Sequence, residues 1–225
     1  MDPTPDAHRQ FLDRLVHDLR EPLRSVHAFS QILAENLKGR LEPADEEILS
    51  QILTGTSRMG ELLEGVSRFT SAMHDGAPGA SLDLAFRSAM SKLEAEVAAS
   101  GATVAAGQLP RVGVSLERLI QLLENLLRNA LTFHGEGPTE IHLLAELQAG
   151  GDWRVTVEDN GIGIDPADFE TVFAPFTKLN GRKYSGAGLG LTVCRTIVER
   201  HSGRIWVESR DPSGCAICLT LPACE

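Results

Sequence analysis

Apolar residues in the first third of the chain recur at alternating steps of four and three, the spacing of helices that pack along one seam. The first seam consists of Leu12, Val16, Leu19, Leu23, Val26, Ser30, Leu33 and Leu37. The second consists of Ile48, Ile52, Gly55, Met59, Leu62, Val66, Phe69 and Met73. A turn at residues 39–43 separates them, and Pro43 suits the first position of a new helix. The pattern predicts two long antiparallel helices.

Two helices with such seams expose an apolar stripe that a single hairpin does not cover. A second copy of the chain would cover it, so we expect a homodimer through residues 8–75 that forms a four-helix bundle. The alternative is a monomeric hairpin that packs against the rest of the chain.

Helices and strands alternate after a break at residues 74–81, whose glycines and proline predict a short linker. The periodicities predict helices near 84–99, 115–133 and 189–201, and extended segments near 102–113, 139–148, 152–158, 204–209 and 215–221. This mixed order predicts an α/β sandwich, in which helices cover one face of a single sheet. The fold class is therefore α+β, with one domain at 1–75 and a second at 76–225.

The chain is acidic, with 21 Lys and Arg against 31 Asp and Glu and a formal net charge of −10. It lacks the basic excess with which proteins bind nucleic acids or anionic membrane surfaces, so we expect neither as a partner. No apolar run approaches the ~18 residues of a membrane span. The first ten residues do not resemble a signal peptide, and we expect a cytoplasmic location.

Cys215 and Cys218 form a C-x-x-C pair, a spacing also found in metal and redox sites. They fall in a segment that reads as a strand, where positions three apart point to opposite faces, and other zinc ligands are missing nearby. We interpret both as small apolar strand residues, with metal or redox chemistry as the alternative.

A carboxylate with glycines behind it directly follows the predicted strand near 152–158. Gly161 and Gly163 would let a flat ligand approach the backbone, and the carboxylate of Asp159 can accept a hydrogen bond from an exocyclic amine. The alternative is an ordinary strand followed by a turn.

A second glycine cluster leads into the predicted helix near 189–201. It consists of Gly186, Gly188, Leu189 and Gly190. The free N–H groups and the positive dipole end of such a helix would attract phosphates. A flexible loop before a helix is the alternative.

Asn125 and Asn129 lie four residues apart on one face of a predicted helix. Asparagine is a poor helix former, so two on one face require a reason. Ligation of Mg²⁺ by their carbonyl oxygens, near phosphates, is one reason, and a pair of buried hydrogen-bonding amides is the other.

His17 lies one position beyond the seam residue Val16, so we expect its imidazole outside the bundle core. Asp18 follows it, and Pro22 lies about one turn further on, inside a helix where proline normally introduces a kink. Taken alone, a surface histidine of this kind is more often inert than functional.

Together these segments resemble the transmitter core of a two-component sensor histidine kinase, over essentially the whole chain. The family's phosphoacceptor, asparagine, first glycine, phenylalanine and second glycine boxes match residues 17–23, 125–130, 159–163, 173–176 and 186–191. The segment around His17 is similar to kinases attached to bacterial phytochromes. The resemblance implies a dimeric helical hairpin followed by a Bergerat-type ATP-binding sandwich, as in gyrase B subunits and ATP-driven chaperones.

The resemblance also implies a protein-histidine kinase that works in two-component signal transduction. His17 would be phosphorylated from ATP, with the carboxylate of Asp18 orienting its imidazole. The phosphoryl group would then pass to an aspartate in the receiver domain of a response regulator. An upstream sensor domain or protein would supply the signal.

For the nucleotide, the resemblance implies that Asp159, with Gly161 and Gly163, binds the adenine end. Asn129 would ligate Mg²⁺, together with Asn125. The phosphate tail would be wrapped under a lid spanning roughly 165–187 by Gly186, Gly188, Leu189 and Gly190, with Lys178 as a cation near the γ-phosphate.

Three residues depart from the family pattern. Thr132 stands where lysine is common, and Ala187 replaces a usual Ser or Thr near the phosphates. Glu21 stands where Thr or Asn often supports phosphatase activity, so we expect kinase activity with weak or absent phosphatase activity.

Two other functions remain possible from the residues alone. One is a phosphotransfer or scaffold dimer with a vestigial ATP domain, although the retention of Asn129 and Asp159 together argues against it. The other is a non-kinase ATPase of the same superfamily, which would not explain a heptad hairpin that carries His17.

Overall fold

The computed structural model describes residues 5–73, 78–179, 186–210 and 213–224. The chain forms two compact units, the first Met1–Ser71 with Ser185–Ala187 and the second Ala72–Tyr184 with Gly188–Glu225. Residues 74–77 of the predicted linker and 180–185 of the predicted lid lie outside the described residues.

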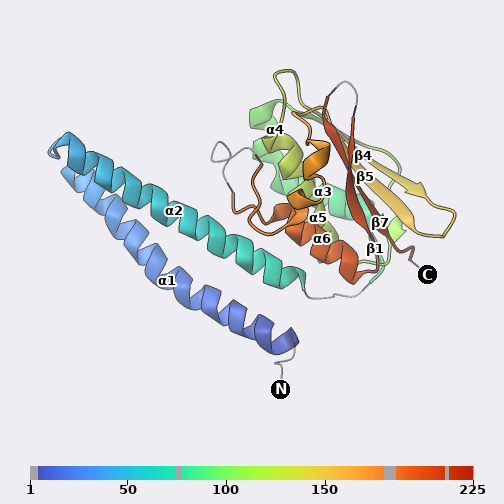
Figure 1. Ribbon diagram of the computed structural model, residues 1–225, viewed down its shortest axis with the longest axis horizontal. Coiled ribbons are helices and arrows are strands. Elements are labelled where there is room, and N and C mark those ends of the chain that lie inside the picture. Colours follow the sequence, from blue (N-terminus) through green and yellow to red (C-terminus); the bar gives the residue numbers. More distant parts are fainter. Residues whose placement is uncertain (1–4, 74–77, 180–185, 211–212, 225) are drawn as a thin grey trace. The chain divides into compact units, whose positions relative to one another are not determined.

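The first unit is an antiparallel helical hairpin, as the seams predict (Figure 1). It consists of α1 (Pro5–Leu37) and α2 (Pro43–Ala72). Helix α1 is continuous through Pro22. Because proline has no N–H, this position removes the hydrogen bond that the carbonyl of Asp18 would otherwise accept, one turn from the predicted phosphoacceptor.

The predicted seam of α1 divides into two sets of residues. Val16 is buried and Leu23 is half-buried, whereas Leu19, Val26 and Leu33 are 47%, 50% and 49% exposed. Alternate seam positions therefore have different neighbours. One set closes the hairpin, and the other stays exposed.

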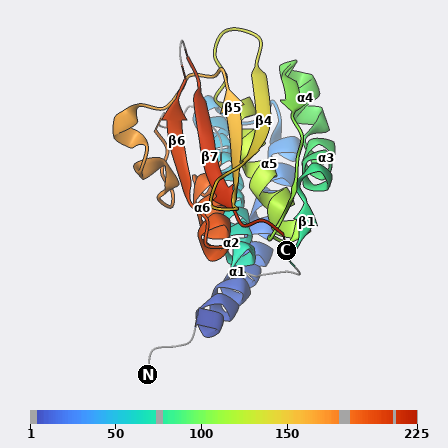
Figure 2. The ribbon, with the colours of Figure 1, turned by 90° about the vertical axis from the view of Figure 1, so that its right-hand side faces the viewer.

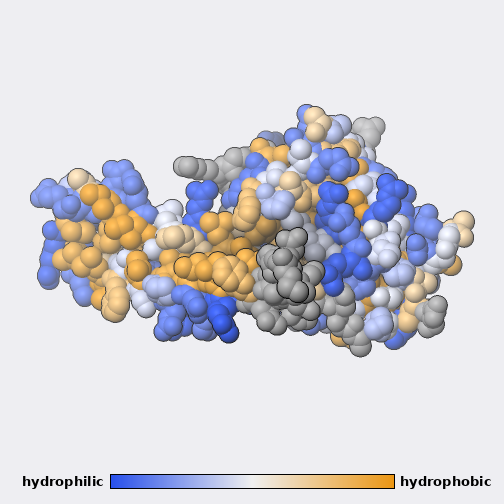
Figure 3. Space-filling view, turned by 60° about the horizontal axis from the view of Figure 1, so that its bottom comes forward, coloured by the Kyte–Doolittle hydropathy of each residue, from blue (hydrophilic) through white to orange (hydrophobic). Residues whose placement is uncertain are grey.

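The predicted seam of α2 is exposed over its first half, Ile48 to Met59, and half-buried from Leu62 to Met73. Ile48, Ile52 and Met59 are exposed, whereas Leu49 and Thr56, close by in sequence, are buried. Apolar side chains are gathered along the hairpin in Figure 3. We call this exposed set the apolar stripe, formed by Leu15, Leu19, Val26, Phe29, Ile32, Leu33, Ile48, Ile52 and Met59.

Two polar contacts link the helices of the hairpin. The Nδ1 atom of His27 lies 2.7 Å from the Oγ1 atom of Thr56, and the Thr70 hydroxyl donates to Asp13 Oδ1 at 2.5 Å. Thr56 and Thr70 are buried. Buried polar groups require partners, so these contacts favour one register of α1 against α2.

The second unit is a five-stranded sheet with helices on one face (Figure 2), which confirms the predicted sandwich. Its strands are β2 (Thr103–Ala106), β4 (Glu140–Leu147), β5 (Trp153–Asp159), β6 (Ile205–Ser209) and β7 (Cys215–Leu221). Its helices are α3 (Leu82–Lys92), α4 (Glu94–Ser100), α5 (Leu116–Thr132) and α6 (Gly190–Arg200), with 3₁₀ turns η1 (Pro166–Asp168) and η2 (Thr171–Phe173). The strand order is β2-β4-β5-β7-β6, with only β2 and β4 parallel.

Helix α5 forms the centre of the core because its leucines recur on one face. The fully buried members are Leu119, Leu122, Leu123, Leu126 and Leu127. Helix α6 packs beside α5, with the Cys194 thiol 3.8 Å from the carbonyl oxygen of Leu122. Among the helices of the described part of the chain, none is both long enough and apolar enough to cross a bilayer.

Two local features differ from the predicted elements. The predicted helix near 84–99 is two helices, because the chain turns at Leu93, a fully buried residue whose N–H is shared between two carbonyls of the preceding turn. The end of the predicted linker contains strand β1 (Ala80–Ser81), which pairs antiparallel with β3 (Arg111–Val112). This pairing ties the entry of the chain to the second unit.

The central position of α5 leads to a stability prediction. We expect Leu122→Ala to lower the free energy of unfolding of the second unit by about 2–5 kcal/mol, because it leaves a cavity in the core. Leu147→Ala is the matched control, since Leu147 is 60% exposed, and its effect should stay below about 0.5 kcal/mol. Urea unfolding followed by the fluorescence of Trp153 and Trp206, the only tryptophans, reports on this unit. Equal losses in both variants would contradict the assignment of the core.

Candidate functional site

The residue predicted to bind an amine, Asp159, ends strand β5 and is only 8% exposed. Its Oδ1 atom accepts a 2.9 Å hydrogen bond from the N–H of Gly161. The same turn lies against the end of α5, because the N–H of Ile162 donates to the carbonyl of Phe133 at 3.0 Å. A Cβ atom at Gly161 would lie 2.3 Å from that carbonyl oxygen, so a side chain has no space there.

Asn160, to which the sequence pattern assigned no role, fastens this turn to the segment before β4. Its Nδ2 atom donates to the carbonyl of Pro138 at 2.8 Å, and its Oδ1 atom accepts from the N–H of Glu140 at 2.9 Å. Gly163 has a φ of +73°, and a Cβ there would lie 3.2 Å from the carbonyl oxygen of Gly214. Residues 159–163, the first glycine box, are therefore in contact with the segment before β4 on one side and with Gly214 on the other.

The two asparagines predicted to lie on one face do so on α5, and they face the start of α6. A Cβ at Gly190 would lie 3.7 Å from Asn129 Oδ1 and 3.8 Å from Asn125 Oδ1. Asn125 is 7% exposed, yet its Nδ2 atom has no hydrogen-bond partner among the described residues. A buried amide in this state is costly unless a ligand satisfies it.

The start of α6 has no side-chain cap of its own. Its N-cap residue, Leu189, makes no capping side-chain hydrogen bond, and the first N–H groups of a helix have no partner within the helix. Gly188, with a φ of +69°, comes so close to the preceding loop that a Cβ there would lie 2.8 Å from the carbonyl oxygen of Thr177. Gly186 has a φ of +114°, is exposed, and donates its N–H to Glu61 Oε2 at 3.1 Å.

The segment between β5 and α6 is anchored on α6 by Phe173. The ring of Phe173 is buried, its carbonyl accepts from the Thr192 hydroxyl at 3.0 Å, and the guanidinium of Arg195 lies 6.0 Å from the ring centroid. Phe176, three residues on, is exposed with a φ of +62°. Lys178, the predicted cation, is exposed in the same segment.

His17 and Asp18 belong to the helical unit, on the exposed side of α1. Their side chains are 81% and 67% exposed, and His17 Nδ1 lies 3.4 Å from Asp18 Oδ1. The imidazole therefore lies outside the hairpin contact, as its place next to Val16 predicts. Its Nε2 atom stays accessible when the Nδ1–H faces the carboxylate.

Two residues that sequence analysis did not place at the site lie against Asp159. The carbonyl oxygen of Asp159 would be 2.0 Å from a Cβ at Gly214, which has a φ of +98°. The thiol of Cys215 donates to Asp159 Oδ2 at 3.3 Å. Burial raises the pKa of the Cys215 thiol well above its ordinary value, and the charge of Asp159 raises it further. The only signal for this contact is the C-x-x-C pair, interpreted above as two structural residues.

The two thiols of this pair lie on opposite faces of β7. Cys215 contacts Asp159, whereas Cys218 lies 3.2 Å from the guanidinium of Arg154 and 3.8 Å from the Thr156 hydroxyl. Both are free thiols. Across the described part of the chain, no group of three or more His, Cys, Asp or Glu residues has the arrangement of a metal site.

These residues fit a magnesium nucleotide in two places along α5. Helix α5 carries Asn125 and Asn129, which lie near Gly190 at the start of α6. The end of α5 contacts the turn that carries Asp159. The unpartnered Asn125 amide and the open start of α6 suit phosphate and its cation. The buried carboxylate suits an amine that donates a hydrogen bond.

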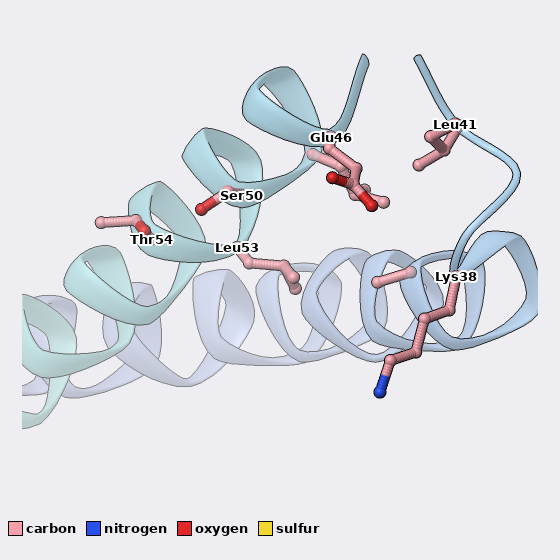
Figure 4. Close-up of a pocket in the computed structure, with 8 residues that line it drawn as sticks. Lys38, Leu41, Glu46, Ser50, Leu53 and Thr54 are labelled. Atoms are coloured by element: carbon pink, nitrogen blue, oxygen red, sulfur yellow. The ribbon is translucent and has the colours of Figure 1, made fainter. Parts of the chain in front are cut away.

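An open pocket lies elsewhere, between α1 and α2 at the turn of the hairpin (Figure 4). Leu41 and Leu53 contribute apolar surface to it, and Lys38 and Glu46 contribute charge. None of the residues predicted to bind the nucleotide lines it.

Comparison with known proteins matches two families to this chain. Residues 7–74 match the His Kinase A (phospho-acceptor) domain. Residues 115–225 match the histidine kinase-, DNA gyrase B- and HSP90-like ATPase family. The first match covers nearly all of the helical hairpin, and the second covers α5, α6 and the strands β4, β5, β6 and β7.

Individual relatives resemble the chain along most of its length. Cyanobacterial phytochrome A of Nostoc sp. is 34% identical over 92% of this chain and 27% of its own length. Full-length ShkA in complex with AMPPNP has a TM-score of 0.68 at 23% identity, over 95% of this chain and 45% of that one. Histidine kinase ThkA in complex with response regulator protein TrrA has a TM-score of 0.65 at 21% identity, over 98% of this chain and 64% of that one. The chain spans about a quarter of the length of the first curated relatives it matches.

Proposed function

This chain belongs to the histidine kinases of two-component signalling, and from that premise we propose that it phosphorylates itself on His17 from ATP and passes the phosphoryl group to a response regulator. One observation carries the proposal. Asn125, buried with an unpartnered amide, and Asn129 converge on the open start of α6, where a phosphate and its cation would complete the hydrogen bonding.

The second domain, residues 76–225, would bind the nucleotide by its adenine end at Asp159. The carboxylate would accept a hydrogen bond from the exocyclic amine, and Gly161 and Gly163 would allow the ring to approach the backbone. A guanine ring presents a carbonyl at that position, which a carboxylate repels. Adenine selectivity is therefore expected from Asp159 alone.

The phosphate tail would lie along α5 and the start of α6. Asn129, with Asn125, would hold Mg²⁺, which supplies neutralisation of phosphate charge when it is bound. The donors at the phosphates would be the N–H groups at Gly188, Leu189 and Gly190, with Lys178 as a further cation. The N–H of Gly186 would join them on release from Glu61 Oε2, to which it donates at 3.1 Å.

The chemistry at the hairpin follows from the His17–Asp18 contact. With Nδ1–H toward the Asp18 carboxylate, the lone pair of His17 Nε2 is free to attack the γ-phosphorus of ATP. An N–P bond forms, the bond from the γ-phosphorus to the bridging oxygen breaks, and ADP leaves with that electron pair. The positive charge that the ring gains is compensated by Asp18.

The phosphoryl group would next move to an aspartate of a receiver domain, which regenerates neutral His17. The ThkA complex with response regulator TrrA supports a partner of this kind. The phytochrome relatives support an upstream sensor. A cytoplasmic location would supply the ATP and keep the four cysteines, Cys194, Cys215, Cys218 and Cys224, reduced.

Incubation with ATP labelled at the γ-phosphate tests the function. We expect label on the chain, followed by its transfer to a receiver domain that is added afterwards. A scaffold dimer with a vestigial ATP domain would take up no label. A non-kinase ATPase would release labelled phosphate without labelling the chain.

The first domain, residues 1–75, would dimerise through the apolar stripe of 8–75. Nine large apolar side chains that are each more than about two-fifths exposed would be covered by a second hairpin in a four-helix bundle. The two copies would then share one phosphoacceptor bundle.

We expect the double variant Val26→Glu and Leu33→Glu to be monomeric, because it places charge in the middle of the apolar stripe. Gln31→Glu is the matched control, since it changes an exposed polar residue of the same helix. Sedimentation equilibrium over a range of concentrations measures both. A double variant that dimerises as strongly as the wild type would assign the dimer to another surface.

A further inference from the structure

The carboxylate of Asp159 has a hydrogen-bond donor on each oxygen. The N–H of Gly161 donates to Oδ1 at 2.9 Å, and the thiol of Cys215 donates to Oδ2 at 3.3 Å. We propose that Cys215 is a positioning residue for adenine recognition, because its thiol fixes the plane in which Asp159 presents its remaining lone pairs to the ligand. The inference deepens the proposed function and rests on it.

The sheet places the thiol where this role requires it. Asp159 and Cys215 are opposite each other in the antiparallel pairing of β5 with β7, and Ser209 of β6 is opposite Cys215 on its other side. Side chains that face each other across a pair of strands lie on the same face of the sheet. The contact is therefore set by a seven-pair ladder from Trp153 to Asp159 and does not depend on a loop.

Both groups are buried, so the bond is not easily replaced by water. Asp159 is 8% exposed and Cys215 is 6% exposed. A carboxylate in such surroundings is costly unless donors surround it. The raised pKa of the Cys215 thiol keeps its proton on sulfur, so the thiol acts as a donor to Asp159 and not as a second anion.

The neighbouring glycines provide no side chain that could orient the carboxylate of Asp159. Gly161, Gly163 and Gly214 have no side chains, and a Cβ at Gly161 would lie 2.9 Å from Asp159 Oδ1. The N–H of Gly161 alone leaves Oδ2 undirected. The thiol supplies the second point that defines the carboxylate plane.

The test compares three variants of the full chain. Cys215→Val removes the donor at nearly constant size, and Cys215→Ser restores a donor. Cys218→Val is the matched control, because Cys218 is a fully buried thiol of the same strand that contacts Arg154 on the opposite face. The readouts are the Kd of ATP carrying a fluorophore on the ribose, and the KM and kcat of autophosphorylation with unlabelled ATP.

We expect Cys215→Val to raise the Kd and KM by about tenfold, the loss for one hydrogen bond to a charged group, with kcat nearly unchanged. Cys215→Ser should stay within about threefold of the wild type, and Cys218→Val should match it. Far-UV circular dichroism checks folding. If Cys215→Val does not fold, Cys215→Ala replaces it with the same expected loss.

Three results would overturn the inference. One is wild-type affinity in Cys215→Val or Cys215→Ala, and another is an equal loss in Cys215→Ser, which would indicate packing and not hydrogen bonding. The third is a loss in Cys218→Val as large as that in Cys215→Val. A wild-type chain that binds no ATP would overturn the proposed nucleotide site itself, which the wild-type titration detects before any variant is compared.

Discussion

His17→Gln takes up no label from ATP labelled at the γ-phosphate, while its affinity for ATP stays at the wild-type value. An amide nitrogen has its lone pair delocalised and cannot replace the Nε2 atom of imidazole as a nucleophile. Removal of a nucleophile eliminates the covalent step, so we expect a loss of at least about a thousandfold in rate. Because the side chain is 81% exposed on α1, the substitution should leave the stability of the hairpin unchanged.

The matched control for this variant is His27→Gln. His27 is on the same helix, but its Nδ1 atom contacts Thr56 inside the hairpin, where glutamine can also form a hydrogen bond. Autophosphorylation is measured by filter binding or gel after equal incubation. Label in His17→Gln at the level of His27→Gln would show that another residue accepts the phosphoryl group.

Asp159→Asn weakens ATP binding by about a hundredfold, the second large effect that we expect. The amide keeps the shape of the carboxylate but has a single acceptor oxygen. That oxygen cannot accept from Gly161, from Cys215 and from the adenine amine at once. The amide NH₂ would in addition face one of these three donors.

Asp152→Asn is the control for charge, since Asp152 is an exposed carboxylate just before the same strand. Titration with ATP carrying a fluorophore on the ribose measures the Kd of both variants, and Trp153 fluorescence checks that β5 is intact. Unchanged affinity in Asp159→Asn would remove the adenine site from this carboxylate.

Much of the site follows from local sequence patterns. Asn125 and Asn129 share a face because of their spacing in a helix, whatever the helix packs against. Gly190 begins α6 as its place before an amphipathic segment indicates. The exposure of His17 follows from its position beside the buried Val16. Each of these features depends on one element alone.

The contact between Asp159 and Cys215 could not be predicted in the same way. The two residues are 56 positions apart, and they meet because β7 lies between β5 and β6 in the sheet. Strand order depends on how the whole sheet assembles, which the alternation of apolar residues in one strand does not record. For the same reason, the sequence did not predict that Ala80, at the end of the predicted linker, pairs with Val112.

The seams of the hairpin show a different limit. A heptad pattern identifies which positions of α1 are buried in a bundle, but it does not say whether the neighbour is the same chain or a second copy. Val16 and Leu23 are covered within the hairpin, whereas Leu19 and Val26 are exposed. In α2 the first half of the seam is exposed, as Ile48 and Ile52 show, and the second half, from Leu62 on, is half-buried.

The most direct test is to incubate the wild-type chain with ATP and Mg²⁺ and to map the phosphoryl group by mass spectrometry of peptides kept at alkaline pH. We expect a single modified peptide that contains His17, with a modification that acid removes and alkali does not, and no modification in Asp159→Asn at limiting ATP. Phosphorylation of any other residue, or an unmodified chain that nevertheless binds ATP, would contradict phosphoryl transfer from the nucleotide site to this histidine.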